Sequence, residues 1–235
     1  MIDFHSHFLP RMDDGSSNLG ESVQMLKQSY KCGVDTIVST SHYYSEYESI
    51  DEFIKRREVK LNWLLPQLHD IDEVPNIVLG SEVSFFSGIS GEKNLQKLCI
   101  AGTKYLMLEM PYSDWSSLNI KELRSLLLNR GITPILAHAE RYIPYQHKNR
   151  IDELLNLGAV FQVNSESVID LRQRKQILKL IKSGIIHVLG SDCHNTKDRP
   201  PNLDAAFNII ENEVGILALK RIEQNGRRIL NDDFI

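Results

Sequence analysis

The chain has 235 residues, of which 42% are hydrophobic and 25% are charged, and its formal net charge at pH 7 is −4. It has no uninterrupted run of about 18 apolar residues and no N-terminal signal-peptide pattern, so we expect no membrane insertion or export and predict a cytoplasmic protein. The mixed-sign, slightly acidic charge offers no electrostatic case for nucleic-acid binding, and the length predicts a single domain over residues 1–235.

Short β-branched apolar runs alternate with longer segments of helical period. This alternation predicts βαβ units around a parallel sheet, an α/β fold with the layout of a barrel. The predicted strands lie at residues 2–5, 35–40, 76–82, 104–109, 133–138, 159–164 and 186–191. The predicted helices lie at residues 19–32, 50–69, 91–99, 118–130, 148–157, 173–183 and 202–224. Several of these helices are followed by a glycine, a common C-terminal cap, at Gly33, Gly131, Gly158 and Gly184.

The first predicted strand ends in two histidines, His5 and His7, which are separated by one residue. Residues i and i+2 of a strand project from the same face, so both imidazoles can bind one metal ion from a rigid support. The pair alone is weak evidence, because this spacing is common. It predicts a metal site only together with similar residues at the ends of other strands.

Further polar residues stand at the carboxyl ends of later predicted strands. They are His42, Glu82, Glu109, His138 with Glu140 and Arg141, and Asp192 with His194. In barrel enzymes the active site is built at this face from the ends of different strands, so residues far apart in sequence converge. We therefore expect these residues to form one site, although each of them alone would also suit a buried hydrogen-bonded group or a surface charge.

The size of this set indicates more than one metal ion. Five histidines with three of the acids, Glu82, Glu109 and Asp192, exceed the three or four protein ligands of a single zinc site, and a mixture of imidazole and carboxylate suits two or three divalent ions. Glu82 or Glu109 could bridge two of them. Asp13 and Asp14 continue the loop after the first strand, where an acid could complete a further ion's shell and where an Asx turn is the alternative.

Taken together, these motifs resemble the polymerase and histidinol phosphatase (PHP) superfamily, and more narrowly its bacterial tyrosine phosphatases of capsular and exopolysaccharide operons. The similarity runs in order from Ile2 to about Pro201. It is carried by His5-Ser6-His7, Asp13-Asp14-Gly15, Thr40-Ser41-His42, Gly80-Ser81-Glu82, His138-Ala139-Glu140-Arg141-Tyr142, Ser191-Asp192-Cys193-His194-Asn195 and Arg199-Pro200-Pro201. The resemblance implies a distorted seven-stranded (β/α) TIM-like barrel and a single PHP-type metal-dependent phosphatase domain.

The resemblance also implies the ligands of three divalent metal ions, with manganese expected first and iron, cobalt or zinc as alternatives. One ion would lie among His5, His7, Glu82 and Asp192. A second would share Glu82 and take Glu109 and His138. The third would be held by Asp14, His42 and His194, with Asp13 as a rival for Asp14. Arg141 and Arg199 match the family's phosphate-binding arginines, whose planar guanidinium groups suit phosphate oxygens.

The activity implied by the resemblance is hydrolysis of protein phosphotyrosine by metal-activated hydroxide. The implied substrate is the flexible tail of a tyrosine kinase that controls capsular or exopolysaccharide biosynthesis. An oligomer is left open, and so is the choice of His194 or Asp14 as the acid that protonates the leaving phenolate. Tyr43, Tyr44 and Tyr47 would form an aromatic rim for the phosphotyrosine ring.

Three other functions stay open from the sequence. A histidinol-phosphate phosphatase, or another small phosphomonoester phosphatase, would use the same metals with a different pocket. A non-catalytic metal-binding regulatory module would be expected to lack several ligands, whereas all nine are present. Cys193 and Arg199 match the C-x5-R spacing of cysteine-based phosphatases, but this loop has no glycine and Asp192 beside the cysteine disfavours a thiolate.

Overall fold

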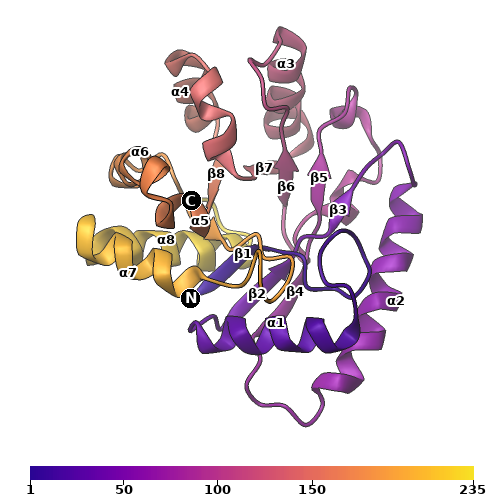
Figure 1. The fold of residues 1–235 in the computed structure, drawn as a ribbon. Helices are drawn as coiled ribbons and strands as arrows, with labels where there is room; N and C mark the ends of the chain where they lie inside the picture. Colours follow the sequence, from indigo (N-terminus) through magenta and orange to yellow (C-terminus); the bar gives the residue numbers. More distant parts are fainter.

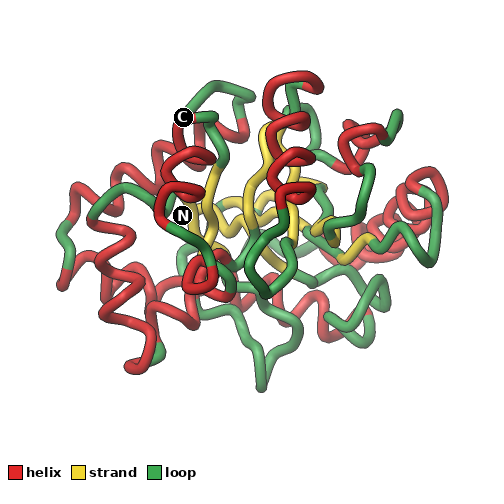
Figure 2. Tube along the Cα trace, turned by 90° about the horizontal axis from the view of Figure 1, so that it is seen from above, coloured by secondary structure: helices red, strands yellow, loops and turns green.

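The structure, a computed structural model, describes residues 1–235 and contains a curled sheet of parallel strands surrounded by helices (Figure 1). Figure 2 shows this arrangement from above, with strands in the middle and helices around them. The strands are β1 (Ile2–Ser6), β2 (Thr36–Ser39), β3 (His42–Tyr43), β4 (Asn76–Leu79), β5 (Glu82–Ser84), β6 (Tyr105–Glu109), β7 (Thr133–Leu136), β8 (Val160–Asn164) and β9 (Val188–Gly190). Each predicted strand is present, and the second and third continue after a break as β3 and β5.

The strands pair in two sets. One set has the order β1-β2-β4 and the other has the order β3-β5-β6-β7-β8-β9, with every pair parallel. The chain after β9 returns to β1, because His7 N–H donates to Cys193 O at 2.9 Å and Asp192 N–H donates to His5 O at 2.8 Å. The first and last strands therefore lie side by side. The expected α/β fold, a distorted (β/α)7 barrel, is confirmed in the form of a curled parallel sheet.

Helices connect successive strands on the outside of the sheet. They are α1 (Leu19–Lys31), α2 (Ile50–Leu68), α3 (Ser117–Ser125), α4 (Lys148–Asn156), α5 (Ser165–Ile169), α6 (Leu171–Lys182), α7 (Leu203–Glu213) and α8 (Ile216–Leu230). Ser49 and Glu52 form a capping box that begins α2. The four glycines predicted as helix caps all have positive φ, which is the conformation that ends a helix most readily with glycine. None of these helices is both long and apolar enough to span a membrane.

Three predicted helices differ in detail from the structure. Residues 91–99 form no α-helix but two short 3-10 turns, η1 (Ile89–Gly91) and η2 (Leu95–Leu98), because Gly91 and Asn94 are poor helix formers and interrupt the period. The predicted helix at 202–224 is two helices that meet at Gly215, whose φ of 111° no continuous helix allows. The short helix α5 was not predicted, and the end of the predicted helix at 118–130 is a π-helical turn, η3 (Leu126–Arg130).

One face of the strands carries apolar residues first and polar residues at the carboxyl end. Val160 of β8 belongs to a buried apolar cluster, and Gln162 and Asn164 follow it on the same face. Met107 and Glu109 repeat this order on β6. A second apolar cluster fills the space between the sheet and the helices. The two apolar clusters therefore pack beneath and around the carboxyl ends of the strands. The polar residues gather at those strand ends.

Candidate metal centre

The nine predicted metal ligands lie together at the carboxyl ends of the strands. Their ligand atoms form groups in which all members lie within 4.8 Å of one another. The groups are His7 with Asp14, His42 and His194; His5 with Glu82 and His138; His5 with His7 and Asp192; and His42 with Glu82 and Glu109. Overlap between the groups makes this one continuous site, as expected for residues that follow different strands of a barrel.

The two histidines of β1 point at each other and at two acids. His5 Nε2 lies 3.1 Å from His7 Nε2 and 3.0 Å from Glu82 Oε2. Asp192 Oδ1 lies 3.4 Å from His5 Nε2 and 3.5 Å from His7 Nε2. These four side chains are the set expected around the first ion, and all of them are buried.

Glu82 stands in the middle of the site. Its Oε1 lies 2.7 Å from His138 Nε2, while its Oε2 faces His5 and lies 3.1 Å from His42 Nδ1. Glu109 Oε1 lies 3.4 Å from the same His138 Nε2. Because its two oxygens face different histidines, Glu82 has the geometry of a carboxylate that could bridge two metal ions.

Asp14, His42 and His194 form the third group. Asp14 Oδ1 lies 3.4 Å from His42 Nε2 and 3.4 Å from His194 Nε2. Asp14 itself is 67% exposed, so this group lies at the mouth of the site. His42 Nδ1 and His194 Nε2 are buried nitrogens without a hydrogen-bond partner. Buried polar atoms of this kind normally have partners. A cation at the centre of this group would satisfy His194 Nε2, and a cation beside Glu82 would satisfy His42 Nδ1.

Attraction between the histidines and the acids of this site favours the charged form of several of them despite their burial. Burial opposes the charged form of His5, but Glu82 and Asp192 raise its pKa above the usual value. Burial also opposes the charged form of Glu82, yet His5 and His138 hold the pKa of that carboxyl well below its usual range. Carboxylates that stay ionised among converging imidazole nitrogens are a donor set suited to divalent cations, so the residues fit the expected metals.

Asp13 and Asp14 have different positions, which the sequence left open. Asp13 Oδ2 lies 2.8 Å from His7 Nδ1 and accepts a hydrogen bond from the His42 backbone N–H at 2.9 Å. It therefore contacts the side of His7 that faces away from the other ligands. A carboxylate at this position orients a metal-binding histidine rather than binding the metal itself. Asp14 is the residue that faces the third group.

Two polar residues of β8 support the site and were missed in the sequence. Gln162 Oε1 accepts a hydrogen bond from the His138 backbone N–H at 2.7 Å and lies 3.3 Å from His5 Nδ1. Gln162 Nε2 donates to Asn164 Oδ1 at 3.0 Å, and Asn164 Nδ2 donates to Asp192 Oδ2 at 2.7 Å. Their signal was a glutamine and an asparagine at alternate positions of an otherwise apolar strand, a pattern that places both amides inside the barrel.

Tight backbone packing holds the histidines in place. A Cβ atom at Gly15 would lie 2.1 Å from His7 O, and one at Gly190 would lie 2.3 Å from His5 Cβ. Two of the predicted ligands, His138 and Asp192, have positive φ values of 34° and 54°, which is uncommon outside glycine. Such conformations persist only where the surrounding structure imposes them, and they are frequent at functional sites.

Arg141 and Arg199 meet at the edge of the site. Arg141 Nη2 lies 3.3 Å and Arg199 Nη2 lies 2.6 Å from Asp192 Oδ2. Both line a cavity of about 140 Å3 together with Asn164, Glu166, Ser191, Asp192, Asp198, Pro200 and Asn202. The lining is polar apart from the proline and includes three acids, and its two guanidinium groups are the donors that would suit an anion next to the predicted ligands.

Other residues singled out in the sequence are not members of the ligand groups. Glu140 is directed at the Asn164 backbone N–H at 3.4 Å, and burial raises the pKa of its carboxyl to about 7. Tyr43 packs against Phe53 in the core, so its expected place in an aromatic rim is wrong. Tyr44 contacts the His42 ring at a centroid distance of 5.4 Å, whereas Tyr47 is 80% exposed.

The cysteine-based alternative does not fit the structure. Cys193 is fully buried, and burial together with Asp3 raises the pKa of its thiol to about 12. A nucleophilic cysteine needs an accessible thiolate, which requires the opposite shift. Its backbone carbonyl instead accepts the hydrogen bond from His7 that joins β1 to the chain after β9.

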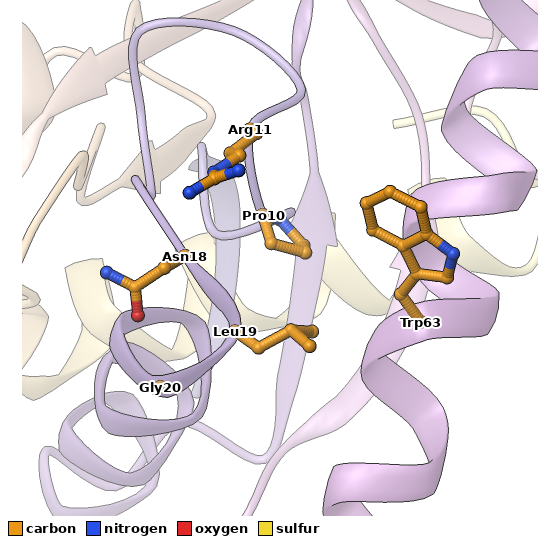
Figure 3. Close-up of a pocket in the computed structure, with 6 residues that line it drawn as sticks. All are labelled: Pro10, Arg11, Asn18, Leu19, Gly20 and Trp63. Carbon is orange, nitrogen blue, oxygen red and sulfur yellow. The ribbon is translucent and has the colours of Figure 1, made fainter.

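A separate cavity of about 360 Å3 lies beyond the loop that carries Asp13 and Asp14. Figure 3 shows Trp63 of α2 facing Pro10 and Leu19 across this opening. The remaining lining residues are Arg11, Asn18 and Gly20. None of the nine predicted ligands lines it, so its size does not make it the reaction site.

Comparison with known proteins agrees with this geometry. Residues 1–231 match the family model described as "Capsular polysaccharide synthesis, CpsB/CapC". The chain is 30% identical to the tyrosine-protein phosphatase CpsB of Streptococcus agalactiae, with 100% of both chains covered. It is 29% identical to the tyrosine-protein phosphatase YwqE of Bacillus subtilis, with 100% of this chain and 93% of YwqE covered.

A solved structure also matches this chain. The fold matches a crystal structure from the work on YwqE of Bacillus subtilis and CpsB of Streptococcus pneumoniae, which are described as unique metal-dependent tyrosine phosphatases. The TM-score is 0.87 at 25% sequence identity, with 100% of this chain and 96% of that chain covered. The motifs at the strand ends, the curled parallel sheet and these matches agree, and the chain belongs to the CpsB/CapC family of capsular polysaccharide synthesis proteins.

Proposed function

We propose that this chain is a metal-dependent protein tyrosine phosphatase, a phosphoric monoester hydrolase formed by one PHP-type domain over residues 1–235. The observation that carries the proposal is the convergence of nine metal-type ligands beside two arginines at one end of the barrel. Relatives that align along the whole chain are tyrosine-protein phosphatases by name. A non-catalytic metal-binding module would not need two arginines that line a cavity next to its ligands.

The nine ligands would hold three divalent ions, and manganese is the ion expected first. His5, His7, Glu82 and Asp192 would hold one ion, and Glu82, Glu109 and His138 would hold a second. Asp14, His42 and His194 would hold the third. When bound, such ions neutralise the charge of a phosphoryl group and activate water as a nucleophile at neutral pH. Asp13, Gln162 and Asn164 would keep the ligands oriented from behind.

The arginines would bind the substrate's phosphate. Arg141 and Arg199 approach the same oxygen of Asp192, so a phosphate in the adjoining cavity can accept hydrogen bonds from both without either side chain moving far. Guanidinium groups in this position stabilise the charge that develops on the phosphoryl oxygens. His194 or Asp14 at the mouth would supply the proton to the leaving phenolate.

The proposed substrate is phosphotyrosine on a flexible protein tail, that of a tyrosine kinase controlling capsular or exopolysaccharide biosynthesis, and the phosphatase would act on it in the cytoplasm. The open mouth at Asp14 and the exposed Arg141 would let an extended peptide reach the ligands while its flanking residues stay in solvent. Histidinol phosphate is the small substrate that the same superfamily resemblance implies. No feature of the lining favours it over phosphotyrosine.

The test combines metal analysis with activity on both substrates. Purified protein should contain manganese or a related divalent ion, and chelation should abolish hydrolysis of a phosphotyrosine peptide until manganese is restored. Cys193→Ser should keep most of the activity. A Cys193→Ser protein that is inactive with its full metal content would contradict the metal mechanism. Histidinol phosphate hydrolysed with a kcat/KM about tenfold above that of any phosphotyrosine peptide would replace the proposed substrate.

A further inference from the structure

A small cavity of about 180 Å3 lies beside Glu109, at the carboxyl ends of β5 and β6. It is lined by Ser84, Phe85, Glu109, Met110, Pro111 and Tyr112. The Phe85 backbone N–H donates to Glu109 O at 2.9 Å, which fixes this wall to the neighbouring strand. Glu109 lies within the ligand groups and also lines this cavity, so the cavity adjoins the proposed metal centre.

Tyr112 connects this cavity to both parts of the site. Its hydroxyl donates to a carboxylate oxygen of Glu109 and accepts a hydrogen bond from Arg141 Nη1 at 2.9 Å. The Arg141 guanidinium lies 5.6 Å from the centre of the Tyr112 ring, and the His138 ring lies edge-on at 5.7 Å. Even so, Tyr112 is 45% exposed. Its polar end is fixed between a metal ligand and a phosphate-binding arginine, while much of its ring stays open to an incoming group.

We propose that the cavity between Phe85 and Tyr112 receives the phenyl ring of an aryl phosphate, and that the Tyr112 hydroxyl positions Arg141. This inference rests on the proposed function and adds to it the part of the site that would distinguish an aryl phosphate from an alkyl phosphate. The volume is adequate, because an apolar protein cavity of about 150 Å3 can hold benzene. Aromatic walls also favour a ring by edge-to-face or offset contact.

The other openings near the site are less suited to a ring. The cavity beside Arg199 is lined by polar residues and one proline, and it fits the phosphate rather than an aromatic group. On the opposite side, Tyr47 contacts Tyr44 and is otherwise exposed, so its ring is not held by any polar anchor at the site. Tyr112 is the exposed tyrosine that is tied to both Glu109 and Arg141.

The test measures ring binding without turnover. Phenylphosphonate and methylphosphonate are titrated calorimetrically into the manganese-loaded protein, and the ratio of their affinities reports the contribution of the ring. Phe85→Ala should weaken phenylphosphonate about fivefold or more and leave methylphosphonate within about twofold. Tyr112→Phe should weaken both ligands through Arg141 and keep their ratio. Tyr112→Leu should lower the ratio as well, whereas the matched control Tyr30→Leu, an exposed tyrosine of α1, should change neither value.

The ratio of the phenylphosphonate affinity to the methylphosphonate affinity decides whether the ring binds in this cavity. An unchanged ratio in Phe85→Ala and Tyr112→Leu, with wild-type metal content and melting temperature, would exclude this cavity as the ring site. A ratio that falls only in Tyr44→Leu or Tyr47→Leu would place the ring beside His42 instead. Calorimetry needs no turnover, so these results test the ring site separately from the proposed function. The proposed function would be contradicted by a different result, a wild-type protein that binds phosphonates but does not hydrolyse phosphotyrosine.

Discussion

At the scale of single residues, Asp192 links the proposed metal centre to the two arginines proposed to bind phosphate. Its Oδ1 faces His5 and His7, while its Oδ2 contacts Arg141 and Arg199 and accepts a hydrogen bond from Asn164. Burial raises the pKa of this carboxyl, but His5 and His7 hold it well below its usual value. Asp192 therefore stays ionised and can serve both functions at neutral pH.

The two arginines should act on the phosphate rather than on folding. Arg141→Ala and Arg199→Ala should each lose about 2 to 4 kcal/mol of transition-state stabilisation, the scale of deleting one charge-stabilising donor. Their side chains are 40% and 42% exposed, so the fold should tolerate the change. Steady-state kinetics on a phosphotyrosine peptide measure the loss, and metal content is the control. Wild-type kcat/KM in both variants would remove these residues from the site.

Asp13 and Asp14 should differ in how they affect bound metal. Asp14→Asn removes a proposed ligand and should reduce the metal stoichiometry by the ion of the third group. Asp13→Asn leaves all nine ligands but loosens His7, so it should weaken metal affinity about 10- to 100-fold without changing the final stoichiometry. Elemental analysis and metal titration separate the two effects. Loss of one ion in Asp13→Asn, with none lost in Asp14→Asn, would reverse the assignment.

At the scale of elements, contact between β9 and β1 sets the position of the first histidine. Gly190 ends β9 directly against His5, and Asp3 accepts hydrogen bonds from the Ser191 backbone N–H and hydroxyl at 2.9 and 2.6 Å. The first strand and the last strand are thereby joined on both sides of His5. Because the barrel-like sheet closes here, the end of the first strand lies beside residues that come almost 190 positions later in the chain.

Gly190→Ala should disturb this junction. The new methyl group would lie 2.3 Å from His5 Cβ and 2.8 Å from His5 N, so the strand must move. We expect a loss of about 1 to 3 kcal/mol in the free energy of unfolding and weaker metal binding. Denaturant unfolding and metal titration measure both. Gly91→Ala, where the added methyl meets no atom within 4 Å, is the matched control. Equal behaviour of the two variants would show that the junction tolerates a side chain.

At the scale of the whole molecule, one histidine outside the site should make stability depend on pH. His187 precedes β9, and its Nδ1 accepts a hydrogen bond from the Phe161 backbone N–H at 3.0 Å. Burial, with a smaller effect of Arg221, lowers the pKa of His187 from 6.5 to about 4. The native protein therefore keeps this imidazole neutral over a range in which the unfolded chain is protonated.

Stability should consequently fall as the pH is lowered from about 6.5 to about 4, because the unfolded state binds a proton that the native state does not. Between pH 7 and pH 5 this group should contribute a loss of about 1 to 2 kcal/mol, given that His187 is partly accessible. Chemical unfolding of chelated wild type and His187→Gln at both pH values isolates the effect, because the other histidines are common to both. Identical pH slopes would contradict it.

The strands and the convergence of the predicted ligands followed from the sequence alone. Alternation of apolar runs with helical segments is a local pattern, and so are the glycines that end helices, because both depend on neighbouring residues. The rule that parallel strands present their carboxyl ends at one face then placed His5, Glu82 and Asp192 together without knowledge of their distances. Prediction failed where local pattern was weak, at residues 91–99 and around Gly215.

Only the tertiary structure decided how the residues around the ligands divide their tasks. Asp13 and Asp14 are adjacent and chemically identical, and the turn at Gly15 against His7 determines which one faces His42 and His194. The tyrosines were equally ambiguous in sequence, because packing against Phe53 buries Tyr43, whereas Tyr112 reaches Arg141 across 29 positions. Residue type and position at the end of a strand predict which residues are ligands. The orientation of their side chains depends on the curvature of the sheet, which arises only when distant strands meet.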